Sequence, residues 1–290
     1  LNREFGYPIE GDDIGECWGI SAHPNGDGTV ASGAYKGMKL SELWEKHPEL
    51  FGDTGMDRFP LLIKIIDAKD DLSIQVHPDD AYAKVHENGS LGKTECWFIL
   101  DCKENATLVV GHNAKSREEL EQMIQEGKWK EFIREIPIKP GDFIQIDPGT
   151  VHAIKGGTLL LETQQSSDIT YRVYDYDRLS NGKPRQLHIT QSIDVITVPA
   201  KSAEISVVHT EKKDDAIQQL ICCPYYTVYR IDVEHRVETW QDKPFVLMSV
   251  VEGEGTLNGT PLKKGDHLIL PDGYGKVELQ GRMQIIASTI

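Results

Sequence analysis

The feature of this sequence that most constrains its fold is a short pattern that occurs twice. Residues 138–149 (IKPGDFIQIDPG) and residues 262–273 (LKKGDHLILPDG) each place a Gly-Asp pair before four mostly apolar residues, which a proline-containing turn then follows. Glycine and aspartate favour tight turns, and a short apolar run between two turns is typical of a buried strand. Strands bounded in this way occur at the rim of a jelly roll. Because the copies lie about 120 residues apart, the pattern predicts two β-barrel domains.

Most of the remaining chain also has the pattern of short strands separated by Gly, Pro, Asn and Asp. The expected strands are residues 59–66, 72–76, 95–100, 107–110, 142–146, 158–163, 226–233, 245–251, 267–270 and 276–279. We expect few helices. The clearest begins at Ser116, where SREE forms a capping box, and Gly127 should separate it from a second helical piece over residues 129–134. Residues 41–46, 79–86 and 190–196 are further candidates.

These elements predict a mainly β protein with two jelly-roll β-barrel domains and a short helical insertion. We expect the first domain over residues 1–200, with the insertion at residues 114–135, and the second over residues 201–290. The boundary falls in the stretch from Pro199 to His209, between the two copies of the Gly-Asp pattern.

The charge and cysteine content exclude several classes of function. The net charge is −15 and no Lys/Arg-rich run is present, so we expect neither a nucleic-acid nor a membrane partner, because both require a basic surface. No apolar stretch is long enough to cross a bilayer. The cysteine number is odd and none forms a Cys-x-x-Cys pair, which argues against a disulfide framework and favours a reducing cytoplasm.

Four polar residues have the types and spacing of a metal site. Gln75 and His77 alternate on one expected strand and therefore share a face, Glu95 begins the next strand, and His152 follows the first Gly-Asp strand. Taken singly, each residue has an ordinary structural role in a turn, core, surface or loop. Together, two imidazoles, a carboxylate and an amide suit a catalytic metal with a coordination position left for substrate.

Four segments, in this order, resemble those of type I mannose-6-phosphate isomerases of the cupin superfamily, most closely the short bacterial form. They are QVHPDD (residues 75–80), GKTECW (92–97), PGTVHAI (148–154) and QQSSDITYRVYD (164–175). The resemblance implies two cupin barrels and one Zn²⁺ per chain at Gln75, His77, Glu95 and His152. It implies that Arg172 is the catalytic arginine. Lys93 matches a substrate-pocket lysine.

The chain departs from the family pattern in two respects. The helical domain that larger members carry is reduced here to residues 115–135, and the second barrel has no equivalent set of metal ligands. We therefore expect the second cupin to be metal-free, with the chemistry confined to the first.

The implied reaction interconverts mannose 6-phosphate and fructose 6-phosphate through an enediolate. A proton must leave C2 and return to C1, and Arg172 and Lys93 can stabilise the negative charge or bind the phosphate. Glu162, at the end of an apolar run, is our candidate base. It could equally be a carboxylate paired with Arg172 or Lys93, and a water on the metal could replace it as base. The ordinary alternative for Arg172 is a salt bridge to one of three nearby acids, Asp168, Asp175 or Asp177.

Two other functions fit the same residues. A two-His, one-carboxylate set also suits the non-haem iron of a cupin oxygenase, although Lys93 and Arg172 favour an anionic sugar. A cupin that binds sugar phosphate without turnover is the second. We expect a small-molecule sugar phosphate as partner, and the oligomeric state stays open between monomer and homodimer.

Overall fold

The computed structural model describes residues 1–11, 13–180 and 182–290. They form two packing units: unit 1 comprises residues 1–65 and 211–290, and unit 2 comprises residues 66–210. The predicted domains, residues 1–200 and 201–290, follow chain order, whereas unit 1 combines both ends of the chain. The domain boundaries therefore stay a prediction. Strands dominate both units, which confirms the mainly β fold class.

Unit 1 is built on two long antiparallel strands, β17 (Phe245–Leu257) and β20 (Gly275–Thr289). The other strands of its sheet are β14 (Ala216–Cys222), β15 (Thr227–Val233), β16 (Arg236–Gln241), β18 (Thr260–Lys263) and β19 (His267–Pro271). β15 and β16 pair with the two halves of β20, and β18 and β19 pair with the two ends of β17. The strands enclose an apolar core that includes Met248, Val250, Leu279 and Ile285.

The N-terminal part of unit 1 packs on this sheet through aromatic rings. Its elements are α1 (Asn2–Phe5), β1 (Glu16–Ile20), α2 (Leu40–Lys46), the 3₁₀ helix η1 (Pro48–Phe51) and β2 (Leu61–Ala68), whose last residues belong to unit 2. The rings of Trp44, Phe51 and Phe59 lie 6.2, 5.6 and 5.6 Å from that of Phe245. Such buried aromatic contacts supply much of the packing energy between elements.

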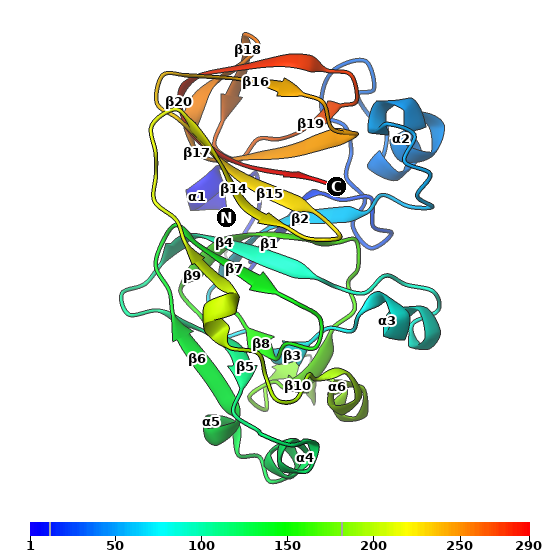
Figure 1. The fold of residues 1–290 in the computed structure, drawn as a ribbon, viewed down its shortest axis with the longest axis vertical. Helices are drawn as coiled ribbons and strands as arrows, with labels where there is room; N and C mark the ends of the chain where they lie inside the picture. The colour runs from blue at the N-terminus through cyan, green and yellow to red at the C-terminus, as the bar shows by residue number, and fades with distance from the viewer. Residues whose placement is uncertain (12, 181) are drawn as a thin grey trace. The chain divides into compact units, whose positions relative to one another are not determined.

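Unit 2 contains strands from two sheets (Figure 1). In one, the order is β9 (Thr158–Gln165), β4 (Glu95–Cys102), β7 (Asp142–Ile146) and β13 (Val207–His209). In the other, the order is β10 (Tyr171–Tyr174), β3 (Ile74–Val76), β8 (His152–Ala153), β5 (Thr107–His112) and β6 (Ile133–Pro137). β11 (Leu179–Ser180) and β12 (Lys183–Pro184) form a small hairpin.

The helices of unit 2 largely match the sequence pattern. They are α3 (Asp80–His86), α4 (Arg117–Gln125), α5 (Trp129–Phe132), α6 (Ile189–Val195) and the 3₁₀ helix η2 (Ala203–Ile205). The Ser116 hydroxyl accepts a hydrogen bond from the Glu119 backbone N–H at 3.2 Å, so the predicted cap is present. The expected helix over residues 129–134 was wrong at its end, because Ile133 and Arg134 begin β6, where Ile133 pairs with His112 of β5. A strand partner so distant in sequence overrides local helix propensity.

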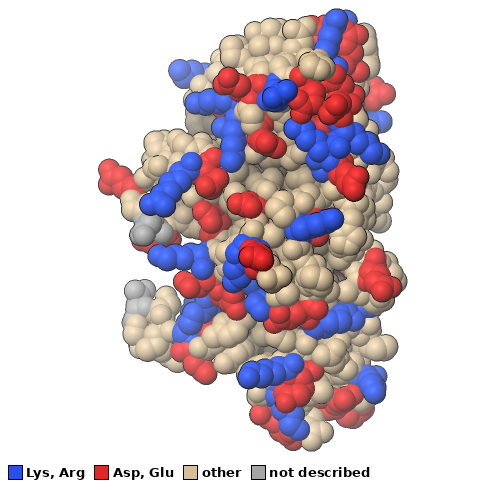
Figure 2. Space-filling view, turned by 90° about the vertical axis from the view of Figure 1, so that its left-hand side faces the viewer, with Lys and Arg blue, Asp and Glu red and all other residues tan. Residues whose placement is uncertain are grey.

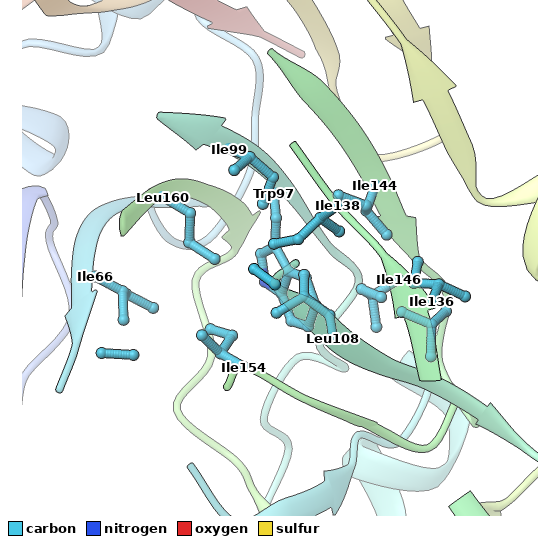
Figure 3. Packing of buried hydrophobic residues seen from close by; sticks show 13 residues of the cluster. Ile66, Trp97, Ile99, Leu108, Ile136, Ile138, Ile144, Ile146, Ile154 and Leu160 are labelled. Atoms are coloured by element: carbon cyan, nitrogen blue, oxygen red, sulfur yellow. The ribbon is translucent and has the colours of Figure 1, made fainter. Parts of the chain in front are cut away.

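The five-stranded sheet has one apolar face and one face that combines apolar and polar residues. Ile74, Val76 and Ala153 belong to a core cluster shared with Leu120 and Ile124 of α4. The second cluster of unit 2, drawn in Figure 3, surrounds Trp97 and includes Leu108, Ile144, Ile146 and Leu160. Because side chains alternate along a strand, packing Ile74, Val76 and Ala153 against the helices turns Gln75 and His152 to the opposite face.

The two Gly-Asp patterns adopt the same turn. Gly141 and Gly265 have φ angles of 88° and 93°, a left-handed conformation that glycine tolerates best. Asp142 Oδ2 accepts the Lys139 N–H at 2.9 Å, and Asp266 Oδ2 accepts the Lys263 N–H at 2.8 Å. Each unit thus contains one copy of the turn before a strand, as the sequence repeat predicts.

The surface is mixed in charge. Figure 2 shows basic and acidic side chains interspersed across the face it presents, as expected for a net charge of −15 without a basic run. Among the described residues, no helix has both the length and the apolar character that crossing a bilayer demands.

Candidate metal centre

Strand register brings three of the predicted site residues side by side. Across β10, β3 and β8, Arg172 lies directly opposite Gln75, and Gln75 lies directly opposite His152. Directly opposed residues of antiparallel strands project from the same face. His77 lies one residue past the end of β3, so strand alternation does not place it, but its Nε2 still lies 3.1 Å from that of His152.

The predicted ligands His77, Glu95 and His152 converge from three separate segments. The two histidine Nε2 atoms are 3.1 Å apart. The Glu95 carboxylate oxygens lie 3.4 Å from each of them, Oε2 from His77 and Oε1 from His152. Among the described residues, this is the one group of three His, Cys, Asp or Glu side chains with ligand atoms mutually within 4.8 Å.

Lys93 lies in the same cluster. Its ammonium Nζ is 3.0 Å from Glu95 Oε2 and 3.1 Å from His77 Nε2, and the residue is 5% exposed. Lys93 thus adjoins the predicted ligands Glu95 and His77, and its contact with substrate stays a prediction. In this structure the lysine is the counter-charge of Glu95.

Glu95 is fully buried, with 0% of its surface exposed. Burial by itself would raise the pKa of Glu95, but Lys93 and the two histidines outweigh it and hold the pKa well below its usual value. The carboxylate is therefore ionised. Neither oxygen accepts a well-formed hydrogen bond from any residue that the structure describes, and an ionised oxygen in this state is unusual unless a cation is its partner.

The two histidines are in the form that binds metal. Burial, and then the charge of Lys93, lowers the pKa of His77 to about 3, and burial also lowers the pKa of His152. Both rings are therefore neutral near pH 7. His152 Nδ1 donates to the Thr150 carbonyl at 2.9 Å, which leaves Nε2 without a proton and facing His77 and Glu95.

The donor set fits a divalent metal. Two neutral imidazole nitrogens and one ionised carboxylate, converging in a buried site, are common ligands of zinc and of related first-row metals. Gln75 is adjacent, with its amide nitrogen 3.3 Å from His152 Nε2 and its oxygen 3.5 Å from the Ser73 hydroxyl. A half-turn of the amide exchanges nitrogen and oxygen, so Gln75 can present the oxygen that a metal requires.

Arg172 lies on the same face but in a different environment. Its Nη1 donates to the Gln186 carbonyl at 3.1 Å, and its backbone N–H donates to His188 Nδ1 at 3.2 Å. Its Nε is buried and has no hydrogen-bond partner among the described residues. Of the three acids expected as alternative partners of Arg172, Asp175 instead pairs with Arg178 and Arg185.

Arg178 and Arg185 were not among the residues singled out from the sequence. Both hydrogen-bond to Asp175, the latter at 2.7 Å through Nε, and their charges act electrostatically on Arg172. Arg178 and Arg185 thus share one carboxylate, which leaves excess positive charge near Arg172. The signal available in the sequence was the run of Arg and Asp over residues 172–185.

Glu162, the candidate base, is buried in the same sheet as Glu95. It lies directly opposite Trp97 on β9, and its Oε2 accepts the indole N–H of Trp97 at 3.0 Å. The Trp97 ring in turn contacts the His152 ring edge-on, with centroids 5.5 Å apart. Glu162 is therefore linked to the ligand set through Trp97, and its role as base stays a prediction.

Comparison with known proteins gives the family. Residues 4–98 match a model described as the type I phosphomannose isomerase catalytic domain, and residues 216–290 match one described as the mannose-6-phosphate isomerase cupin domain. The chain is 51% identical to mannose-6-phosphate isomerase ManA of Bacillus subtilis, over 98% of this chain and 92% of the relative. It is 48% identical to mannose-6-phosphate isomerase of Streptococcus mutans, over 99% and 92%.

A solved structure agrees with these sequence matches. The crystal structure of mannose 6-phosphate isomerase from Bacillus subtilis superposes with a TM-score of 0.92 at 48% identity, covering 100% of this chain and 94% of that one. The described geometry and the sequence matches point the same way. The chain belongs to the type I phosphomannose isomerase family.

Proposed function

We propose that this chain is a zinc-dependent mannose-6-phosphate isomerase, which interconverts mannose 6-phosphate and fructose 6-phosphate. The observation that carries the proposal is the convergence of His77, Glu95 and His152 in one buried cluster, with Lys93 in contact. Relatives with that printed name, at 51% and 48% identity over nearly the whole chain, support the substrate and the reaction.

The four predicted ligands, Gln75, His77, Glu95 and His152, would hold one zinc ion. When bound, zinc supplies Lewis-acid chemistry that polarises oxygen atoms of the sugar without redox change. The neutral rings and the ionised carboxylate support this proposal, because metal binding requires these protonation states.

Arg172 and Lys93 provide positive charge for the proposed reaction. Isomerisation moves a proton from C2 to C1 through an enediolate, whose oxygens carry negative charge. The guanidinium of Arg172 can donate two parallel hydrogen bonds to such an oxyanion or to the phosphate. This local charge is needed because the protein carries a net charge of −15, which repels an anionic sugar.

We propose Glu162 as the group that carries the proton between C2 and C1. Trp97 fixes the orientation of its carboxylate, and burial keeps bulk water from it. A positioned base of this kind contributes on the order of 10²–10⁴-fold to the rate. Glu162→Gln keeps the shape and should lose on the order of 10²-fold or more in kcat while metal content is unchanged.

The test is a coupled assay of fructose 6-phosphate formation from mannose 6-phosphate, before chelation, after chelation and after zinc is added back. We expect activity to disappear and return. His77→Ala and Glu95→Ala should lose both metal and turnover, whereas Arg172→Lys should keep the metal and lose about 10²-fold in kcat. His235→Ala, at an exposed histidine, is the matched control.

Two outcomes would contradict the proposal. Turnover that survives complete chelation would remove the metal from the reaction. Oxygen uptake in place of isomer formation would favour the iron oxygenase alternative. The predicted cytoplasmic location and the choice between monomer and homodimer stay predictions.

A further inference from the structure

A chain of hydrogen bonds behind the metal cluster connects the two histidine ligands to a distant part of unit 2. Its central link is Gly149, in the loop between β7 and β8. The Gly149 N–H donates to the His77 carbonyl at 2.9 Å, and the Gly149 carbonyl accepts the Thr197 N–H at 3.0 Å. His152 lies three residues after Gly149, at the end of the same loop, and its ring N–H donates a hydrogen bond to the Thr150 carbonyl.

Gly149 fits this position because it has no side chain. Its φ is 79°, and a Cβ there would lie 2.4 Å from the Thr197 hydroxyl oxygen and 2.8 Å from the Val195 carbonyl oxygen. The loop and the segment after α6 are therefore in direct contact. A shift of Thr197 would move Gly149, and with it the backbone of His77.

His112 lies at the other end of this chain of hydrogen bonds. Its Nε2 donates to the Thr197 carbonyl at 2.9 Å, and the residue is 3% exposed. Its ring stacks on Phe132, with centroids 5.5 Å apart and planes 15° apart. The ring therefore has little freedom to turn, and its donor nitrogen points at one backbone carbonyl.

The strand that carries His112 also adjoins His152. On β5, Val110 lies directly opposite His152, and the Gly111 N–H donates to the Val151 carbonyl at 2.6 Å. Arg134 closes the arrangement, since its Nε donates to the Val110 carbonyl at 2.9 Å and its Nη2 to the Lys201 carbonyl. β5, the histidine loop and the segment after α6 thus form one hydrogen-bonded layer.

We propose that His112 is a positioning residue for the metal centre, acting through Thr197 and Gly149 to fix the spacing of His77 and His152. The inference rests on the proposed function in so far as these histidines bind a metal. His112 touches neither metal nor substrate in this role. It acts as an outer partner of the ligands, and loss of such partners typically weakens metal binding 10–100-fold.

Two substitutions separate this role from simple space filling. His112→Gln retains an N–H donor at the position of Nε2, and His112→Leu fills similar volume with no donor. We expect His112→Leu to bind zinc about tenfold or more weakly in competition with a chromophoric chelator, and His112→Gln to recover most of the affinity. Unfolding of the metal-free variants in urea measures any purely structural cost separately.

A third variant covers the case in which His112→Leu does not fold. Gly149→Ala forces the loop away from Thr197 and should also weaken zinc binding, whereas Thr197→Val, which keeps the backbone bonds, should not. Wild-type zinc affinity in folded His112→Leu or in Gly149→Ala would overturn the proposal. So would equal loss in the Leu and Gln variants. If the wild-type chain binds no zinc at all, the proposed function fails instead, and the isomerase assay shows that independently.

Discussion

At the scale of single residues, the pairing of Glu95 with Lys93 decides the electrostatics of the cluster. A buried carboxylate is costly unless a positive charge or hydrogen bonds compensate it. Glu95 has no well-formed hydrogen bond from a described residue, so the ammonium of Lys93 at 3.0 Å is its main compensation in the metal-free protein. Lys93 therefore has a structural role besides any contact with substrate.

This dependence predicts a metal-linked stability defect. Lys93→Met leaves Glu95 buried and uncompensated, so the metal-free variant should lose about 3 kcal/mol in its free energy of unfolding. Added zinc should restore much of that loss, because the metal then supplies the positive charge. Urea unfolding with and without zinc measures both effects.

The matched control is Lys155→Met. Lys155 pairs with Glu135 at 2.8 Å, but both side chains are partly exposed, so we expect a loss below about 1 kcal/mol with no dependence on zinc. Similar losses in the two variants would contradict the role given to Lys93.

The sequence predicted a ligand set by residue type and order, and the structure brings His77, Glu95 and His152 together, but the neighbours of these residues could not be predicted. Arg172 was expected either to act in catalysis or to pair with an acid such as Asp175, and the acid is instead paired with Arg178 and Arg185. The choice depends on how the loop after β10 folds, which local patterns do not encode. His112 was missed for the same reason: its partner is a backbone carbonyl 85 positions away.

At the scale of elements, the alternation of side chains between the two faces of a strand was the most reliable predictor of where strands begin. Strands such as β7 and β9 begin where the sequence predicts, because period-two burial and flanking turns act locally. β6 was missed because it begins directly after α5, with no turn residue between the two elements to mark the change.

The helical insertion offers a test at this scale. Ser116 caps α4, and Glu119 reaches back to the Lys115 N–H at 2.7 Å. Ser116→Ala should lower the free energy of unfolding by about 1 kcal/mol, with kcat unchanged. Ser116→Asp, which retains a capping acceptor, should stay near wild type. Urea unfolding and the coupled assay provide the measurements, and a large loss of activity in Ser116→Ala would show that the insertion takes part in catalysis.

At the scale of the whole molecule, the packing units could not be read from chain order. Residues 1–65 group with residues 211–290, although about 145 residues separate the two segments. Contacts that join both ends of a chain leave no composition change at a boundary, and for this reason sequence patterns indicated two barrels but not which segments pack together.

Stability against acid depends on a histidine of unit 1. His267 lies between the Ser249 hydroxyl at 2.7 Å and the Tyr7 hydroxyl at 2.9 Å, and burial lowers its pKa to about 4 although Asp266 nearby opposes the shift. Because this pKa is below that of the unfolded chain, the unfolded state binds more protons between pH 6.5 and 4. The stability that neutral His267 contributes to the fold is therefore complete above pH 6.5 and is lost as the pH falls from 6.5 to 4.

The loss should amount to roughly 3 kcal/mol by pH 4. His267→Gln should be less stable at pH 7 and should show a flatter dependence of the unfolding free energy on pH. His235→Gln, at an exposed site, should keep the wild-type slope. Urea unfolding at several pH values between 4 and 7 measures the slopes, and identical slopes for wild type and His267→Gln would refute the assignment.

The net charge of the metal cluster bears on the direction of the proposed reaction. Glu95 and Lys93 cancel, and the rings of His77 and His152 are neutral, so a divalent ion would give the cluster a charge close to that of a phosphate monoester but opposite in sign. Aldose and ketose phosphates carry identical charge. This charge would therefore attract both sugars of the proposed reaction alike, and the net flux between them would follow their concentration ratio relative to the equilibrium ratio.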